Sequence, residues 1–228
     1  MNDFLTLLHR DRLTLIMSLP VNDPALCAAA FDAGADVVKV HINVQHRASG
    51  THFGRLSEER GALETMLAHK TGPMGLVTGG TLEAAGLDLD GATAMPFSFF
   101  SLYAHCAPTA ALRCGVPLML ACDSTYSLDE VEYMADTGAS VLEASVIPGA
   151  EYGTALSARD LMRYRAIARR TTLPVVVPTQ RRIEPDDAAL LRAAGVKSLM
   201  IGAVVTGRDV HSVTRAVTAF RRAIEAGV

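Results

Sequence analysis

The chain has 228 residues, half of them hydrophobic and one fifth charged, and its formal net charge at pH 7 is −3. A chain of this length and composition can bury a core without disulfides or a structural metal, so we expect a globular protein. The near-neutral charge and the scattered basic residues argue against nucleic acid or an anionic membrane as a partner. No hydrophobic run reaches the length of a membrane span, and the apolar part of the N-terminus is too short for a signal peptide.

The cysteines show neither C-x-x-C pairing nor the spacing of a disulfide framework; they are Cys27, Cys106, Cys114 and Cys122. This usage predicts buried thiols in a reducing compartment. We therefore expect a cytoplasmic protein.

Eight short apolar runs follow one another at regular spacing and predict eight β-strands. They cover Thr14 to Leu19, Val37 to Asn43, Met74 to Thr78, Ala92 to Phe97, Pro117 to Ala121, Ser140 to Ser145, Pro174 to Pro178 and Ser198 to Gly202. Several begin just after a glycine that can end a helix in the left-handed conformation, such as Gly34 and Gly195. Runs that are apolar throughout are typical of strands buried on both faces, as in a parallel sheet.

Helical patterns fill the intervals between the predicted strands. One face of the last predicted helix carries Val210, Val213, Val217, Phe220 and Ile224. Helix-start signals stand at Asp23-Pro24, Ser127 with Glu130, and Ser157 with Asp160. Eight strand–helix units predict a single (β/α)₈ TIM barrel over residues 1–228. The alternative is an open doubly wound sheet, but the chain has no G-x-G-x-x-G fingerprint.

In such a barrel, catalytic groups come from the carboxyl ends of the strands. Alternation places Lys39, His41 and Asn43 on the inner face of the second strand. On the sixth strand, Glu143 and Ser145 share the inner face. Because the second and sixth strands lie opposite each other in a ring of eight, we expect Lys39 and Glu143 to approach one substrate or to pair with each other.

We predict that Lys39, Glu143, Asp123 and His41 are the catalytic residues. A buried charge must be paired or neutralised, and such pairs often serve proton transfer. Protonated Lys39 would stabilise an enolate, whereas neutral Lys39 would form a Schiff base with a carbonyl. A structural ion pair that carries out no reaction is a third interpretation, and the sequence does not choose among them.

Residues 198–207 form a strand, a glycine, a short loop of small residues and a second glycine before the last helix. Backbone N–H groups at a helix start bind phosphate, and the loops after strands seven and eight carry phosphate sites in many barrels. We predict a phosphate site at Gly202, Ala203, Thr206 and Gly207, with Arg182 supplying a guanidinium fork. A tight turn permitted by glycine is the plain alternative.

The longest irregular connection runs from Gln45 to Leu56, and its glycines would let it fold over the mouth as a lid. Arg47 or Arg55 would then contact a phosphate or a carboxylate, while an ordinary surface loop is the alternative. The aromatic segment 98–103 is expected to serve core packing or a subunit contact. The predicted substrate-binding set is Asn43, Arg47, Ser145, Thr179 and Gln180.

Histidines offer a competing interpretation, in which a metal ion would stabilise an enediolate. The ligands would be His41, His46 and His52 with Asp123 and Glu143. Their spacing supports this idea only weakly, and we expect neither a metal nor a cofactor.

Three segments resemble the ribulose-phosphate-binding TIM barrels, and within them the N-acylmannosamine-6-phosphate 2-epimerases. Residues 118–125, Leu-Met-Leu-Ala-Cys-Asp-Ser-Thr, are similar to that family's fifth-strand Asp-x-Ser-Thr segment. Residues 182–188, Arg-Ile-Glu-Pro-Asp-Asp-Ala, are similar to its Arg-Ile-x-x-Pro-Glu-Asp-Ala stretch, and residues 200–206 to its phosphate loop. The likeness covers mainly residues 117–217, and it implies a phosphorylated, sugar-like ligand and metal-free proton transfer next to a carbonyl.

The chain departs from that family at the reacting groups. The family's catalytic lysine on the third strand has no counterpart in residues 74–78, and its glutamate after the seventh strand falls near Gln180. We therefore carry over the phosphate site and not the epimerase activity, with Lys39 and Glu143 as our own candidates for the two roles.

The sequence thus leads to the hypothesis of an enzyme that acts on a small phosphorylated carbonyl compound and transfers a proton next to the carbonyl, as isomerases and epimerases do. One alternative is a Schiff-base aldolase or lyase that uses Lys39. Another is a non-catalytic protein that binds a phosphometabolite or serves assembly. A homo-oligomer is left open.

Overall fold

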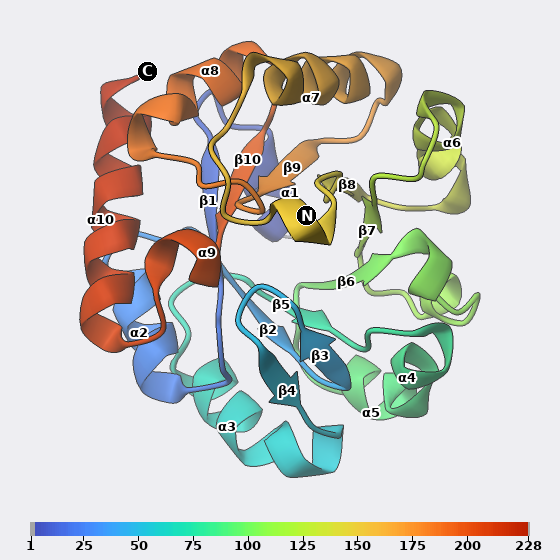
Figure 1. Cartoon of the computed structure of the whole chain (residues 1–228). Helices are drawn as coiled ribbons and strands as arrows, with labels where there is room; N and C mark the ends of the chain where they lie inside the picture. The colour runs from blue at the N-terminus through green and yellow to red at the C-terminus, as the bar shows by residue number, and fades with distance from the viewer. Residues whose placement is uncertain (1–2, 228) are drawn as a thin grey trace.

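The computed structural model describes residues 3–227, which contain a closed barrel of eight parallel strands (Figure 1). In sequence order around the ring, each strand pairs with the next, and the last strand pairs back onto the first. The barrel strands are β1 (Thr14–Ser18), β2 (Val37–His41), β5 (Met74–Val77), β6 (Phe99–Tyr103), β7 (Leu118–Cys122), β8 (Val141–Ala144), β9 (Val175–Pro178) and β10 (Ser198–Ile201). The predicted (β/α)₈ barrel is confirmed.

Helices surround the barrel and connect its strands (Figure 1). The α-helices are α1 (Asp3–Leu8), α2 (Pro24–Asp32), α3 (Leu56–His69), α4 (Leu82–Leu87), α5 (Leu89–Thr93), α6 (Leu128–Tyr133), α7 (Ala158–Arg170), α8 (Ala188–Ala193), α9 (Ala203–Thr206) and α10 (Val210–Ala226). Short 3₁₀ helices are η1 (Ala104–Cys106), η2 (Ala111–Arg113), η3 (Met134–Thr137), η4 (Gly149–Glu151) and η5 (Pro185–Asp187). The predicted start signals are confirmed at the N-termini of α2, α6 and α7.

Apolar side chains fill two regions and leave one end of the barrel for polar groups. A large cluster between the strands and the helices contains the residues that face outward from the barrel, such as Val38, Val40 and Leu142. A smaller cluster fills the barrel axis near the amino ends of the strands, where α1 closes the barrel. There the rings of Phe4 and Phe99 stack with centroids 3.9 Å apart. Thr14 and Ser198 are buried polar residues at the amino end, where the Thr14 hydroxyl donates to the Leu7 carbonyl of α1. The charged side chains on the axis lie at the carboxyl end.

The fourth barrel strand differs from the prediction. The expected strand, Ala92 to Phe97, is not formed: Leu89–Thr93 is helix α5, and the strand is Phe99–Tyr103. Alanine favours a helix, whereas the aromatic residues that follow favour a strand. The shift turns the side chains of Ser101 and Tyr103 toward the barrel mouth.

The predicted irregular lid is in fact an antiparallel hairpin beside the mouth, which consists of β3 (Val44–His46) and β4 (Thr51–Phe53). Gly50 lies in the turn with a φ of 67°. Phe53 is buried at 1% exposure, so the hairpin is docked on the barrel. A turn that ends in a left-handed glycine is typical of a hairpin, so Gly50 belongs to a hairpin turn and not to the expected hinge.

The four cysteines are all free of disulfides. Three of them are buried, as expected, while Cys114 is partly exposed. Within residues 3–227, no helix has both the length and the apolar character to cross a membrane.

Candidate functional site

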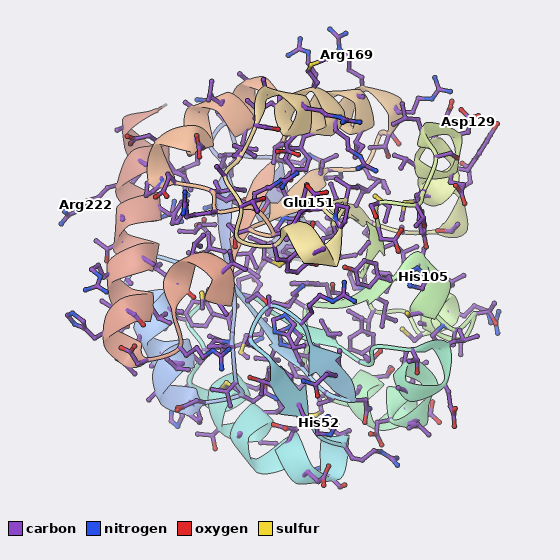
Figure 2. The ribbon with its side chains drawn as sticks, viewed as in Figure 1. His52, His105, Asp129, Glu151, Arg169 and Arg222 are labelled. Carbon is purple, nitrogen blue, oxygen red and sulfur yellow. The ribbon has the colours of Figure 1, made fainter. Side chains whose placement is uncertain are left out.

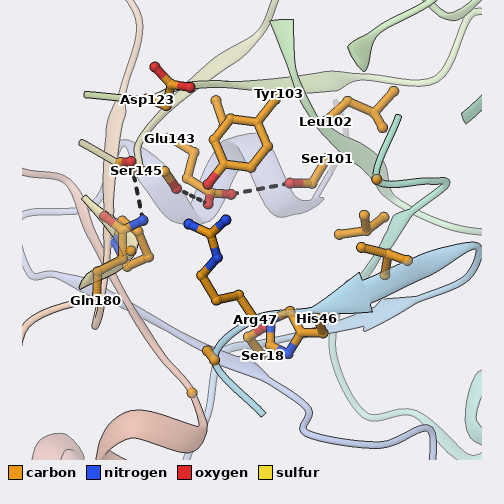
Figure 3. Close-up of a pocket in the computed structure, with 18 of the residues that line it drawn as sticks. Ser18, His46, Arg47, Ser101, Leu102, Tyr103, Asp123, Glu143, Ser145 and Gln180 are labelled. Atoms are coloured by element: carbon orange, nitrogen blue, oxygen red, sulfur yellow. Dashed lines mark hydrogen bonds between the residues drawn. The ribbon is translucent and has the colours of Figure 1, made fainter. Parts of the chain in front are cut away.

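A cavity of about 400 Å³ opens at the carboxyl ends of the barrel strands (Figure 3). Its lining includes axis-facing residues of the strands, the hairpin β3–β4, and the loops that follow β6, β8 and β9. This size and this position at the carboxyl face are those of a small-molecule site in a (β/α)₈ barrel.

At the bottom of the cavity, an ion pair crosses the barrel. Lys39 Nζ lies 3.2 Å from Glu143 Oε2, and the two residues are 5% and 6% exposed. The pair forms because β2 and β8 are opposite strands of the ring and both residues face inward. The predicted approach of these two side chains is therefore confirmed.

Two serines complete the surroundings of the Glu143 carboxylate (Figure 3). Ser145 Oγ donates to Oε1 at 2.6 Å, and Ser101 Oγ donates to Oε2 at 3.2 Å. A carboxylate has about four lone-pair positions, and Lys39 and the two hydroxyls occupy three of them. The carboxylate is therefore fixed in orientation and still has one acceptor position.

Gln180 connects the loops beside the Lys39–Glu143 pair through three hydrogen bonds. Its Nε2 donates to the Ser145 carbonyl at 3.1 Å and to the Tyr152 hydroxyl at 2.6 Å, and its Oε1 accepts from the Ile147 N–H at 3.0 Å. Burial raises the pKa of the Tyr152 hydroxyl, and it raises that of Tyr103 still further. Both phenols are therefore neutral hydrogen-bonding groups at physiological pH.

His41 lies where the hairpin docks. Its ring is 4.5 Å from the ring of His46 and 4.7 Å from that of Phe53, and its Nε2 lies 3.5 Å from Ser18 Oγ. Burial, followed by the charges of His46 and Lys39, lowers the pKa of His41 well below 6.5. Burial, with Lys39 second, also lowers the pKa of His46 to about 4. Both imidazoles are neutral at pH 7.

Asp123 lies on the rim of the cavity, just after β7. Its Oδ1 accepts from the backbone N–H of Thr125 at 2.8 Å and from the Thr125 hydroxyl at 2.6 Å. Partial burial raises the pKa of Asp123, but these hydrogen bonds outweigh burial and the pKa is lower than usual. Asp123 is thus an ionised acceptor rather than an acid.

The predicted phosphate residues separate into two groups. Gly202 lines the cavity, and its N–H donates to Thr179 Oγ1 at 3.1 Å. Ala203 follows as the first residue of α9, where N–H groups have no acceptor within the helix. Thr206 and Gly207 lie at the other end of α9, and the Thr206 hydroxyl donates to the Gly207 carbonyl at 3.0 Å.

Ala203, Thr206 and Gly207 are not among the residues that line the cavity, and neither are Arg182 and Asn43. The Arg182 side chain is 62% exposed, and its Nε lies 3.6 Å from Glu184 Oε1. The backbone of residue 182 forms a β-bridge with the loop after β8, and the side chain points outward. Asn43 takes a left-handed φ of 54°, which breaks the alternation of β2. Its amide donates to the Thr78 carbonyl and to Asp88.

Arg47 replaces Arg182 as the guanidinium of the cavity. It follows β3 in the hairpin turn, and its side chain extends over the cavity toward the Glu143 carboxylate (Figure 3). Arg55, the other arginine considered for this role, is bound to Asp88, with two N···O distances of 2.9 and 2.8 Å.

The alternative metal site is not formed. Across residues 3–227, no group of three or more histidine, cysteine or carboxylate side chains is close enough to hold a metal ion. The rings of His41 and His46 pack against each other at a tilt of 41°, whereas His52 is exposed on β4 (Figure 2).

Sequence reasoning missed several residues of the cavity, chiefly Ser101, Tyr103 and Tyr152. The first two were hidden by the misplaced fourth strand, although Phe99, Ser101 and Tyr103 alternate as strand residues do. No local signal marked Tyr152, which reaches the cavity from the loop between β8 and α7.

Comparisons with known proteins identify the fold. No protein-family model matches the chain, and no curated protein matches its sequence. Thiamine phosphate pyrophosphorylase from Pyrococcus furiosus is similar in structure, with a TM-score of 0.65 and 18% identity over 95% of this chain and 97% of that one. KGPDC from Streptococcus mutans has a TM-score of 0.68 and 14% identity over 94% and 98%.

A tryptophan synthase complex from Pyrococcus furiosus has a TM-score of 0.71 and 15% identity, with 92% of this chain and 98% of that chain covered. At such low identities, a likeness demonstrates a common architecture and no common chemistry. The nearness to N-acylmannosamine-6-phosphate 2-epimerases stays a prediction. Together, the closed ring of strands and these similar structures establish that the chain has the (β/α)₈ TIM-barrel fold.

Proposed function

We propose that this protein is an enzyme that transfers a proton at the carbon next to the carbonyl of a small phosphorylated compound, as an isomerase or epimerase does. The observation that carries the proposal is the buried Lys39–Glu143 pair at the bottom of an open cavity. Desolvating two charges is costly, and a pair of apolar residues of the same size would stabilise a barrel at least as well. A buried pair that faces a cavity therefore points to chemistry.

In this mechanism the Glu143 carboxylate removes the proton, and the electrons of the C–H bond move toward the carbonyl oxygen. An ammonium group has three N–H donors. Lys39 uses one of them on Glu143 and has two for the oxygen that becomes negative. Glu143 then returns the proton from the same face to the neighbouring carbon, as in an isomerase; an epimerase needs a second proton donor on the opposite face of the same carbon. Ser101 and Ser145 keep the carboxylate oriented during both steps.

A phosphorylated substrate is favoured by the position of the cavity, which reaches Thr179 and Gly202 at the carboxyl ends of β9 and β10. Barrels of this fold commonly bind phosphate there. The resemblance of residues 117–217 to sugar-phosphate epimerases supports the same interpretation. Thiamine phosphate pyrophosphorylase, whose name includes a phosphate compound, shares the fold.

Schiff-base chemistry at Lys39 is the second candidate for the same cavity. It needs a neutral amine, whereas the Glu143 carboxylate at 3.2 Å stabilises the ammonium form. The geometry therefore favours proton transfer. Borohydride treatment with a bound ketone separates the two mechanisms, because only an imine leaves a covalent mass adduct on Lys39.

The proposal is tested by incubating the protein in D₂O with a panel of phosphorylated aldoses and ketoses and following C–H exchange by proton NMR. We expect exchange next to the carbonyl of at least one compound, and its loss in Lys39→Met. Lys197→Met is the matched control, since Lys197 is exposed at the opposite end of the barrel, just before β10. If binding occurs without exchange, the protein is a non-catalytic binding module and the proposal is wrong.

A further inference from the structure

Arg47 places a cation above the cavity. Its side chain extends from the hairpin turn toward the centre of the site (Figure 3). Among residues 3–227, no carboxylate lies within ion-pair distance of its guanidinium, and no acceptor takes a hydrogen bond from it. A guanidinium has five N–H donors in a planar fork that matches a carboxylate or a phosphate.

The other charges of the cavity do not neutralise Arg47. Lys39 and Glu143 cancel each other in their ion pair. The lowered pKa values of His41 and His46 leave both rings neutral. Asp123 is ionised, but it lies on the β7 side of the cavity, where its Oδ1 accepts from Thr125. Arg47 is therefore the cation that the hairpin side of the cavity presents to a ligand.

The hairpin fixes the backbone that carries Arg47. His46, the residue before Arg47, packs against the His41 ring and forms a hydrogen bond through Nδ1 with Ser49 Oγ at 2.7 Å. Ser49 is completely buried, and Phe53 is 1% exposed. The turn that carries Arg47 is thus anchored from both strands, so its backbone is ordered before a ligand arrives.

Gly149 provides the space that the guanidinium occupies. A Cβ atom at position 149 would lie 2.1 Å from Arg47 Nη1 and 2.8 Å from its Cζ. Any side chain there would push the guanidinium away. The backbone of Gly149 does not need a glycine, since its φ is not positive. The absence of a side chain at position 149 therefore leaves room for the guanidinium of Arg47.

We propose that Arg47 binds an oxyanion of the substrate, a phosphate or a carboxylate, and that Gly149 is the positioning residue for it. The anion lies between the hairpin turn and the loop after β8. That the bound anion belongs to a substrate rests on the proposed function. That Arg47 binds an anion does not depend on turnover.

The test measures binding by calorimetry with three matched probes: D-ribose 5-phosphate, D-ribonate and D-ribose. The wild type should bind at least one charged probe more tightly than D-ribose, and the comparison of the two charged probes tells phosphate from carboxylate. Arg47→Met should weaken that binding at least tenfold, and Arg47→Lys should weaken it less. Arg60→Met, on the exposed face of α3, is the control that should leave it unchanged.

Gly149→Ala should also weaken binding of the charged probe, without a change for D-ribose. In the Arg47→Met background the same substitution should have no further effect, because the guanidinium it displaces is already gone. Gly202→Ala tests the ends of β9 and β10 as the alternative position of the anion; the added Cβ meets only ordinary contacts of 3.6 Å with Ser18. Loss in Gly202→Ala together with full binding in Arg47→Met would overturn the assignment.

Two further results would also overturn it: charged probes that bind the wild type no better than D-ribose, or additive effects of Gly149→Ala and Arg47→Met. Circular dichroism of each variant checks that the fold is kept. The exchange assay is separate, so a protein that binds anions through Arg47 but exchanges no proton would refute the proposed function alone.

Discussion

The buried pair of Lys39 and Glu143 leads to a prediction about the free energy of unfolding. Lys39 and Glu143 are both less than a tenth exposed, and their charges lie 3.2 Å apart. Lys39→Met leaves the carboxylate with two serine donors and no counter-charge, and Glu143→Gln leaves the ammonium without one. Removing one partner of a buried pair costs about 3–5 kcal/mol. For a domain of this size, that lowers the unfolding midpoint by roughly 6–20 °C.

The double variant Lys39→Met with Glu143→Gln removes both charges and keeps an amide oxygen that Ser145 can donate to. It should be more stable than either single variant, by about 2 kcal/mol or more. Urea unfolding followed by far-UV circular dichroism gives the three free energies, with Lys197→Met as the control for loss of a lysine. If the two single effects simply add, the charges do not interact across the barrel and the prediction is wrong.

Three further predictions concern the surroundings of the site. Gly75→Ala should lower stability by about 1–3 kcal/mol in thermal unfolding, because the new Cβ would lie 2.1 Å from the Phe99 ring; a variant as stable as the wild type would contradict this. His46 has its pKa lowered to about 4 by burial, so the unfolded chain takes up its proton near pH 6.5 before the folded protein does. Stability should therefore fall between pH 6.5 and pH 4, and His46→Gln should flatten that fall by about 2 kcal/mol; unchanged pH curves would count against a buried neutral ring. Gln180→Glu removes the donors to Ser145 and Tyr152 and should cost about 1–3 kcal/mol in urea unfolding at pH 8; a stabilised variant would show that these hydrogen bonds are unimportant.

The fold could be predicted because its signals are local and repeated. Glycines such as Gly34 and Gly195 end helices with φ values of 104° and 94°, and apolar runs follow them directly. Besides the hairpin β3–β4, the prediction failed at residues 92–103, where two neighbouring segments are both apolar. There only the alternation of Ser101 and Tyr103 distinguished the strand from helix α5.

The central pair of the site could also be predicted, because strand period and ring geometry together determine which side chains meet. These two rules alone predict that Lys39 and Glu143 face each other. Residues on loops could not be placed in this way. Arg182 and Arg47 are both arginines near the mouth, and only the backbone beyond the strand ends decides that the first turns to Glu184 and the second extends over the cavity.

Proton transfer by Glu143 is tested most sharply by the rate of solvent deuterium incorporation next to the carbonyl in Glu143→Gln, measured against the wild type on the same phosphorylated compound. The variant keeps the size of the side chain and loses its ability to take a proton. We predict a fall of about 10²–10⁴-fold, the usual contribution of a general base. Equal rates in a folded variant would show that Glu143 moves no proton and would contradict the proposed mechanism.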